Sequence, residues 1–560
     1  MVAFGIKLPP FGGGKKPGGK KRSGGGRIIP PTWKFPDLKK RDAYGYYPIV
    51  CPYCLDTFHI WEAEFRSVAP YMNAGADINI GNVQNRPVQQ NENWGRRANR
   101  NQADSENEQY QFNNVNNNIG NIQSAAGDNG GFPLEMDEKY DEFEKRFGGQ
   151  QNATSRGKVL RIFDEYGNPT GEVTHITLMD TQKGGNDEDN LIVPIEGRKA
   201  RDFEHRPIMS VINKYGQLCK ERICPHCHHR VSNYVGIWPN YTVALIGDTK
   251  VGKTVYLHKL GAALSTYGIL DGTLIGSEAN PDYKSWIRSA MEMDERAQEN
   301  QPMMGLTTIQ FMPPNIIDFK NTQKGGGFIL NLFDFPGEAL SKPIKNDDGS
   351  MDQFKSHYLP KIDRMDAWML LFDAPGFQTV FTVFQSDEEL RPYVAERLNS
   401  VTPIEILNYF ENEYLASHRN RFIKPLAVIV SKSDLIKVAR DKNIDYFPDL
   451  PQDQRFLDPN PNINRDKMKV DLDDINQCAA EMEAFFKGSR DEGLLKRITT
   501  DQENGEYCWF AVSSKGDATN AVADPVRVTE PMEWILWRLG LVQGVGNNIP
   551  GGGNPDKVNY

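Results

Sequence analysis

The sequence predicts an α/β fold in three layers, with a mostly parallel sheet enclosed by helices. Two observations lead to this prediction. From Tyr241 onward, short apolar runs alternate with segments that can form helices, and each run ends in small or polar residues. Strands buried on both faces have this continuous apolar character, and the loops at their carboxyl ends carry the ligand contacts. In chain order the runs are TVALIG, FILNLFDF, DAWMLLFDA, PLAVIVSKSD and YCWFAVSSK.

The first run leads into GDTKVGKT, residues 247–254, which matches the phosphate-binding pattern G-x-x-x-x-G-K-[ST]. Glycines let a backbone close around a phosphate, and the helix that follows presents its positive end to the anion. Lys253 would bridge the β- and γ-phosphates, and the Thr254 hydroxyl would bind Mg²⁺. The motif therefore predicts a P-loop NTPase domain. The expected nucleotide contacts in this loop are Gly247, Asp248, Thr249, Lys250, Val251, Gly252, Lys253 and Thr254.

The second run ends in DFPG, which fits the D-x-x-G element of GTPases. Asp334 would hold Mg²⁺, and the amide of Gly337 would contact the γ-phosphate. A second D-x-x-G, at residues 373–376, ends the next run. We interpret this second match as an ordinary strand ending.

The fourth run ends in SKSD, residues 431–434, which fits the guanine element [NT]-K-x-D with Ser431 in the first place. The carboxylate of Asp434 would accept hydrogen bonds from N1–H and the exocyclic amine of guanine. Adenine offers no such pair of donors. The stem of Lys432 would lie over the base.

The last run ends in Ser513, Ser514 and Lys515, which resemble the S-A-K element that supports the base through a backbone N–H. Each short motif is weak alone, but their order and their positions at strand ends form a set. The set predicts GTP as the substrate and GDP as the product. An ATPase of the same layout is the alternative.

Four residues are candidates for catalysis of hydrolysis: Lys250, Lys253, Thr308 and Glu338. Lys250 would place positive charge near the β–γ bridge as charge develops there, or would face solvent. Glu338 would orient the attacking water or accept its proton, or would be structural. Thr307 and Thr308 precede an expected strand, and either would complete the Mg²⁺ shell.

Four of the seven cysteines form two C-P-x-C pairs, Cys51 with Cys54 and Cys224 with Cys227. Each C-x-x-C turn offers two thiolates, and two turns supply the four ligands of tetrahedral Zn²⁺. In a reducing compartment such pairs indicate metal rather than disulfides. We therefore expect a structural zinc ribbon closed across a wide gap in the sequence. The nearby His226, His228, His229 and Cys219 are expected to be neighbours of the site rather than ligands.

The chain has 560 residues, more than one hydrophobic core usually organises, and only 39% are hydrophobic. We therefore expect several units and some disorder. The expected division is 1–42, a basic Gly-rich disordered tail; 43–80 and 218–238, the zinc-ribbon halves; 81–131, an Asn/Gln-rich disordered insertion; 132–217, a partly ordered insertion; 239–545, the GTPase domain; and 546–560, a flexible tail.

Local patterns add three elements to this division. MDEKYDEFEKRF is expected to form a short charged helix, and KVLRIFDEYGNP with GEVTHITLMD to form a hairpin. DLDDINQCAAEMEAFFKG is expected to form a helix that packs on the core or binds a partner.

Charge and hydropathy limit the function classes. The net charge of −9 argues against general coating of nucleic acid, but the tail GGGKKPGGKKRSGGGR would be able to contact it locally. No apolar run approaches the length of a membrane span, and the first residues lack the apolar core of a signal peptide. We expect a cytoplasmic protein without a membrane span.

The chain resembles the double-GTPase 2 (DO-GTPase2-like) family of TRAFAC-class GTPases in VCPYC, ICPHCHHRV, VALIGDTKVGKT, LFDFPGE, VIVSKSD and VSSK. The resemblance covers about residues 48–56 and 218–545. It implies a zinc ribbon just before a GTPase domain, and a role in prokaryotic conflict (defence) systems encoded beside partner effectors. The wide gap between the cysteine pairs and the serine at Ser431 depart from the family pattern.

The sequence thus predicts a regulatory GTPase whose GTP and GDP forms are read by a protein effector or by operon-encoded partners. One alternative is a nucleic-acid-binding protein that uses the zinc ribbon and the basic tail and is regulated by nucleotide. The other is the P-loop ATPase.

Overall fold

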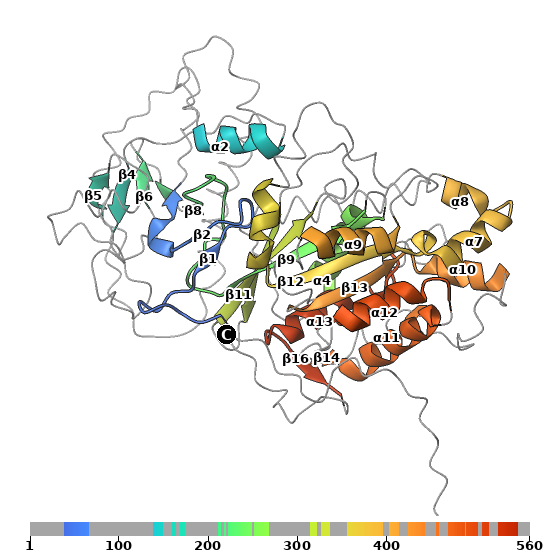
Figure 1. Cartoon of the computed structure of the whole chain (residues 1–560). Helices are drawn as coiled ribbons and strands as arrows, with labels where there is room; N and C mark the ends of the chain where they lie inside the picture. The colour runs from blue at the N-terminus through green and yellow to red at the C-terminus, as the bar shows by residue number, and fades with distance from the viewer. Residues whose placement is uncertain are drawn as a thin grey trace, which may run out of the picture.

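Figure 1 shows a computed structural model of the chain. The structure describes residues 39–65, 138–148, 160–163, 169–173, 211–213, 218–219, 222–248, 251–267, 314–321, 326–335, 356–395, 402–413, 424–442, 455–457, 469–487, 489–501, 507–514 and 525–546.

The central element of the described part is a six-stranded sheet with the order β10-β11-β9-β12-β13-β15. Only β10 runs antiparallel to its neighbour β11, and the other adjacent pairs in this sheet are parallel. The predicted mostly parallel sheet is therefore confirmed. Its strands are β9 (Asn240–Gly247), β10 (Asn315–Asn321), β11 (Gly326–Asp334), β12 (Ala367–Asp373), β13 (Leu426–Ser431) and β15 (Tyr507–Ala511).

The strands form where the sequence has continuous apolar runs. Every residue of β9, β12, β13 and β15 is buried, as expected for strands covered on both faces. Helices supply the outer layers: α4 packs on β9, α13 on β13 and α11 on β15. The helices are α4 (Lys253–Tyr267), α7 (Gln378–Ser386), α8 (Arg391–Ala395), α9 (Pro403–Glu413), α10 (Asp434–Lys442), α11 (Leu472–Phe486), α12 (Glu492–Asp501) and α13 (Glu530–Arg538).

A small module, which we call the cysteine module, joins residues 44–65 to residues 222–238. Strand β1 pairs antiparallel with β2, and β3 pairs antiparallel with β8 across the long insertion. Figure 1 shows this module beside the start of β9 and β11. Its apolar side chains and those of the central sheet belong to one continuous core. The strands are β1 (Ile49–Val50), β2 (Thr57–Phe58), β3 (Glu64–Phe65) and β8 (Arg222–Ile223), with a short 3₁₀ turn η1 (Ile60–Glu62).

The insertion contributes a helix and a separate sheet. Helix α2 (Glu138–Phe143) continues as the π-helical turn η3 (Glu144–Gly148), so the expected charged helix is confirmed. The expected hairpin is confirmed by the antiparallel pairing of β4 with β5. The sheet has the order β5-β4-β6-β7. Its strands are β4 (Leu160–Phe163), β5 (Pro169–Val173), β6 (Val211–Asn213) and β7 (Leu218–Cys219).

The expected helix near residue 475 is confirmed as α11, and it packs on the core. The side chain of Asp471 accepts a hydrogen bond from Asp474 N and so caps the helix. Its apolar face, which includes Ile475 and Met482, is buried. The remaining described elements are β14 (Lys469–Asp471), β16 (Gln543–Val545), η6 (Leu359–Arg364), η7 (Ala374–Gly376) and η10 (Arg455–Leu457).

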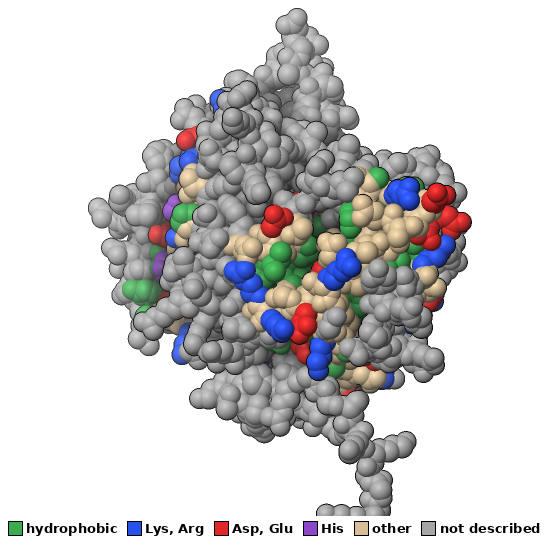
Figure 2. Space-filling model, turned by 45° about the vertical axis from the view of Figure 1, so that its right-hand side comes forward, with side chains coloured by type: hydrophobic (Ala, Val, Ile, Leu, Met, Phe, Trp, Pro, Cys, Tyr) green, Lys and Arg blue, Asp and Glu red, His purple; other side chains and the backbone are tan. Residues whose placement is uncertain are grey.

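One face of the described part of the chain has mixed charge. On the face drawn in Figure 2, Lys and Arg side chains are interspersed with Asp and Glu side chains. Such mixing is typical of an ordinary solvated surface. Among the described residues, no helix combines the length and the apolar character needed to cross a bilayer.

Candidate functional site

The ends of neighbouring strands bring the predicted motifs to one edge of the central sheet. In the parallel register, Gly247 on β9 lies opposite Leu371 on β12, and Asp373 lies opposite Ser431 on β13. On the other side of β9, Asp334 at the end of β11 lies opposite Leu245. The phosphate loop, the D-x-x-G aspartate and the guanine element therefore share the carboxyl edge of the sheet, where open α/β sheets bind ligands.

Two positions of the phosphate loop require glycine, each for a different physical reason. A Cβ on Gly247 would lie 2.5 Å from the carbonyl oxygen of Leu371, because β9 and β12 pass close together there. Gly252 has a φ of +92°, which a residue with a Cβ adopts only with strain. Asp248 and Val251 are buried beside them. The predicted contacts Thr249 and Lys250 lie outside the described residues.

Lys253 is the first residue of α4 and is directed back towards the loop. Its Nζ donates to the carbonyl oxygens of Gly247 at 2.6 Å and of Asp248 at 3.1 Å. The side chain is buried in this position. An ammonium group over the loop, at the positive end of a helix, is suited to an anion such as a phosphate. Thr254, the next residue, is half-buried at the same helix end.

Ser431 connects the phosphate loop to the guanine element. Its hydroxyl donates to Val251 O at 2.7 Å and also lies 3.2 Å from Phe372 O. The side chain is buried, so these contacts are sheltered from water. The guanine element usually begins with Asn or Thr, but the short hydroxyl of Ser431 also reaches both carbonyl groups. The serine is therefore compatible with a fixed phosphate loop.

The two predicted base elements meet in space. The hydroxyl of Ser513 donates to Asp434 Oδ1 at 2.7 Å, and Ser433 N donates to Val512 O at 3.1 Å. Asp434 begins α10 and is half-buried. Ser514, the residue after Ser513, is half-buried, whereas Lys515 lies outside the described residues.

Asp373 has a role that the sequence interpretation missed. This buried carboxylate at the end of β12 accepts a hydrogen bond from Lys432 Nζ at 3.1 Å. Lys432 itself has a φ of +54°, which turns the guanine loop sharply after β13. The signal was available, because adjacent parallel strands that end in Asp and in Ser-Lys place the two charges side by side. Asp373 is therefore a fixed counter-ion and more than an ordinary strand ending.

Two of the predicted magnesium ligands, Thr254 and Asp334, lie within the described residues. Asp334 is buried at the end of β11, and the hydroxyl of Thr254 is at the start of α4. A carboxylate and a hydroxyl are the oxygen donors that Mg²⁺ uses beside substrate phosphates. These two residues would hold the ion, which would neutralise phosphate charge. The other predicted residues, Thr307, Thr308, Gly337 and Glu338, lie outside the described residues.

Among the described residues, the four predicted cysteines come together as a cluster with the composition and spacing of a metal site. Their Sγ atoms all lie within 4.8 Å of one another, and all four side chains are buried. Cys51 and Cys227 are separated by 3.7 Å between Sγ atoms, and Cys54 and Cys224 by 3.8 Å. Ligands 2.3 Å from a tetrahedral Zn²⁺ are about 3.8 Å apart, whereas a disulfide needs about 2.05 Å. The cluster fits zinc, which would cross-link the two halves of the module.

The two cysteine turns have the same backbone geometry. Leu55 has a φ of 57° and donates its N–H to Cys51 O at 2.9 Å. His228 has a φ of 55° and donates its N–H to Cys224 O at 2.9 Å. His226 N also donates to the sulfur of Cys224 at 3.4 Å, a bond that favours the thiolate. We call these turns the first and second knuckles.

The neighbouring histidines contact other groups, as expected. The Nε2 atom of His228 lies 3.0 Å from a carboxylate oxygen of Glu64, and both side chains are buried. His226 Nε2 lies 3.3 Å from Thr57 O, at the module surface. Cys219 lies in β7. Among the described residues, the cluster that fits a metal ion comprises the four cysteines alone.

His229 ties the inserted helix to the module. Its Nε2 lies 2.7 Å from Glu144 Oε1, and its ring is stacked between Tyr53 and Tyr140, with centroids 4.4 Å away on each side. Tyr140 and Glu144 come from the helix that follows the Asn-rich stretch. The insertion therefore returns to the cysteine module before the second knuckle.

No model of a known family matches this chain, and neither does any curated protein. Among solved structures, it is similar to the Ski7 GTPase-like domain of S. cerevisiae bound to GTP, with 13% identity, 49% of this chain and 43% of that chain covered, and a TM-score of 0.20. Era of Aquifex aeolicus bound to GDP and AlF4− gives 15% identity, 37% and 48% coverage, and a TM-score of 0.16.

A septin GTPase domain from Chlamydomonas reinhardtii gives 12% identity, 39% and 64% coverage, and a TM-score of 0.18. The match spans less than two thirds of the length of each of these three structures.

Proposed function

We propose that the protein binds GTP with Mg²⁺ and hydrolyses it, acting as a regulatory GTPase with a structural zinc ribbon. The observation that carries this proposal is the continuous set of contacts from base element to phosphate element. Asp434 accepts from Ser513, and Ser431 in the same loop donates to Val251 of the phosphate loop. A single ligand with a guanine at one end and phosphates at the other would satisfy both ends.

The roles follow from the chemistry of each group. Lys253 would leave the carbonyl groups of Gly247 and Asp248 and bind the β- and γ-phosphates. Thr254 and Asp334 would hold Mg²⁺, which would offset the phosphate charge. Asp434 would accept the two guanine donors, and this pairing would discriminate against adenine because adenine leaves the carboxylate unsatisfied.

The residues that we assign to the hydrolytic step lie outside the described residues, and the sequence motifs support their assignment. We assign Lys250 to the charge that develops at the β–γ bridge, Glu338 to the attacking water, and Thr307 or Thr308 to the Mg²⁺ shell. The amide of Gly337 would sense the γ-phosphate, and Lys515 would complete the base loop. The loops after Thr307 and Asp334 would differ between the GTP and GDP forms, and a protein partner would read the difference.

The resemblance to double-GTPase 2 proteins supports a partner encoded in the same operon, within a prokaryotic defence system. The metal centre would stabilise the cysteine module by cross-linking its two chain segments, which are far apart in the sequence. This role is structural, because the four thiolates would leave no open ligand position for catalysis.

The decisive experiment is nucleotide competition on the purified full chain. A fluorescent GTP analogue is bound in the presence of Mg²⁺ and displaced with unlabelled GTP or ATP, and phosphate release is followed separately. We expect GTP to compete at least about 100-fold better than ATP, because adenine leaves the Asp434 carboxylate without its two donors. Equal competition by GTP and ATP would refute the guanine assignment, and a preference for ATP with release of phosphate from ATP would make the protein an ATPase.

A further inference from the structure

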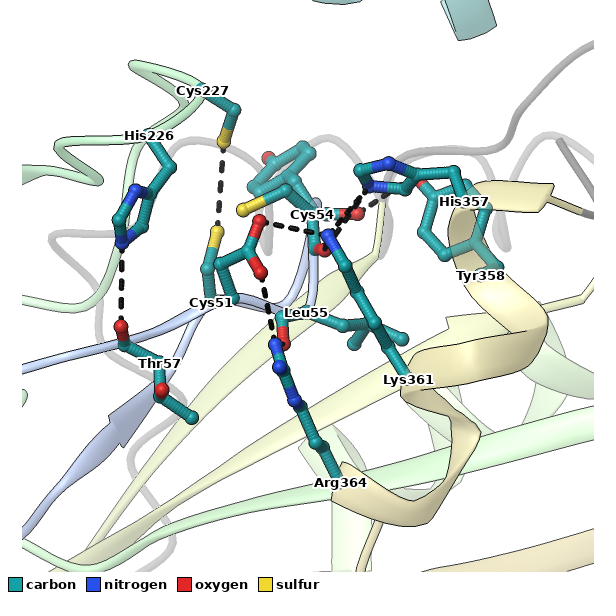
Figure 3. Close-up of polar contacts among 12 residues, drawn as sticks. Cys51, Cys54, Leu55, Thr57, His226, Cys227, His357, Tyr358, Lys361 and Arg364 are labelled. Atoms are coloured by element: carbon teal, nitrogen blue, oxygen red, sulfur yellow. Dashed lines mark hydrogen bonds and ion pairs between the residues drawn. The ribbon is translucent and has the colours of Figure 1, made fainter. Parts of the chain in front are cut away.

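Residues 356–364 link the nucleotide-binding sheet to the cysteine module, and we call them the knuckle-contact segment. They follow β11, which ends in Asp334, and precede β12. Figure 3 shows Lys361 and Arg364 projecting from this segment towards the first knuckle. The segment thus lies between β11 and β12 in the chain and reaches the cysteine cluster.

Two cations of the segment converge on Asp56, two residues after Cys54. Lys361 Nζ donates to Asp56 Oδ2 at 2.8 Å, and Arg364 Nη1 donates to Asp56 Oδ1 at 2.9 Å. The same cations also bind backbone carbonyl groups of the knuckle. Lys361 donates to Cys54 O at 3.1 Å, and Arg364 donates to Leu55 O at 2.6 Å.

Tyr358 connects the knuckle directly to the end of β11. Its hydroxyl donates to Tyr53 O at 2.7 Å, and its ring centroid lies 5.2 Å from that of Phe333, the residue before Asp334. The side chain is fully buried. Burial raises the pKa of the Tyr358 hydroxyl well above its ordinary value, so it remains a donor. A displacement of the end of β11 would therefore be transmitted to the knuckle through the packed rings of Phe333 and Tyr358.

The charge of the metal site makes this contact depend on metal. Four thiolates around one Zn²⁺ leave a net charge of about −2. The positive charges of Lys361 and Arg364 lie beside it and are only partly offset by Asp56. Without the ion, the first knuckle would no longer be closed on the second, and the carbonyl groups that the segment binds would lose their fixed positions.

We propose that the knuckle-contact segment couples zinc binding to nucleotide state, so that GTP and GDP forms hold the metal with different affinity. This inference rests on the proposed GTP binding. Coupling between two binding sites is reciprocal, so loss of zinc would change the ratio of GTP to GDP affinity by the same factor. The cysteine module would then be the internal reader of the nucleotide state, as well as a structural element.

The test measures zinc affinity by equilibrium competition with a chelator that leaves Mg²⁺ free. The full chain is used with saturating GDP or with a non-hydrolysable GTP analogue, after binding of each nucleotide has been verified by fluorescence. We expect the two apparent zinc affinities to differ by about 5-fold or more, the usual lower range of allosteric coupling. The double variant Lys361→Met with Arg364→Met should reduce the difference to less than about 2-fold while both nucleotides still bind.

Two further variants keep the result interpretable. Tyr358→Phe retains the ring packing and removes only the hydroxyl, so it tests the coupling if the double variant does not fold. Lys442→Met removes a lysine that forms ion pairs with Asp387 and Glu389 away from the knuckle, and it should keep the wild-type difference. Equal zinc affinities in wild-type protein that binds both nucleotides would refute the coupling alone. Failure to bind either guanine nucleotide would refute the proposed function, and the coupling with it.

Discussion

The hydroxyl of Ser513 donates a hydrogen bond to Asp434 Oδ1 over 2.7 Å. These residues come from different strand ends, and the bond fixes the carboxylate that we assign to guanine. Ser433 N, which donates to Val512 O, holds the same two loops together through the backbone. A carboxylate oriented in this way loses little freedom when it binds a base, and preorganisation of this kind favours affinity.

Asp434→Asn should exchange guanine preference for xanthine preference. The amide would donate to the C2 oxygen of xanthine, where guanine carries an amine. Two hydrogen bonds to a charged group contribute about 1.5–3 kcal/mol each, so GTP affinity should fall by about 100-fold or more. Competition with GTP and xanthosine triphosphate measures the change. Asp441→Asn, in the same helix but exposed, should leave both affinities unchanged. Retention of GTP binding by Asp434→Asn would contradict the base assignment.

Lys253→Met should abolish tight binding of the triphosphate. Lys253 lies at the start of α4, and its ammonium nitrogen is within 3.1 Å of two loop carbonyl oxygens. Its replacement by an apolar chain of similar length removes charge-assisted bonds to the phosphates, and we expect a loss of about 100-fold in GTP affinity by calorimetry. Lys437→Met on the exposed face of α10 is the matched control. A Lys253→Met protein with wild-type affinity would show that phosphates bind elsewhere.

Gly247→Ala should destabilise the fold even without nucleotide. The new Cβ would lie 2.5 Å from Leu371 O, so β9 and β12 would have to separate. Overpacking of this kind costs about 1–3 kcal/mol in the free energy of unfolding, which urea denaturation measures. Gly493→Ala is the control, because its Cβ would make only an ordinary contact of 3.9 Å with Ile404. It should change the free energy by less than about 1 kcal/mol. Equal effects of the two substitutions would argue against the close approach.

Cys224→Ser should remove bound zinc and destabilise the cysteine module. One ligand of four is lost, and a neutral hydroxyl is a poor replacement for a thiolate. We expect about one zinc per chain in the wild type and close to none in the variant by elemental analysis, with a lower melting temperature. Cys478→Ser alters a buried cysteine in α11 outside the cluster, and its zinc content should stay at the wild-type level. Zinc retained by Cys224→Ser would disprove the four-cysteine site.

The unfolding free energy should rise with pH in the alkaline range because of Lys259. Burial in α4 lowers the pKa of its ammonium from 10.5 to about 8. Between these two values the unfolded chain binds more protons than the folded chain, so raising the pH favours the folded state. Urea denaturation from pH 7 to pH 10.5 measures the slope, and Lys259→Met should remove this component. The same slope in both proteins would show that Lys259 does not titrate in this way.

The sequence by itself determined the elements and the motifs that depend on local spacing. Continuous apolar runs specified β9, β12, β13 and β15, because strands covered on both faces have no solvent-facing side. The spacing of glycines and Lys253 specified the loop between β9 and α4. Each C-P-x-C pair specified one knuckle, because two thiolates in one tight turn need only local geometry.

The tertiary structure decided which distant residues meet. It placed the second knuckle against the first across the insertion, and it placed Asp373 beside Lys432 through the strand register. It also placed Lys361 and Arg364 on Asp56, a contact between residues about 300 positions apart that no local pattern indicates. Periodicity reports only which face of an element is buried. The partner that covers that face, and the charges that it carries, are decided when the layers pack together.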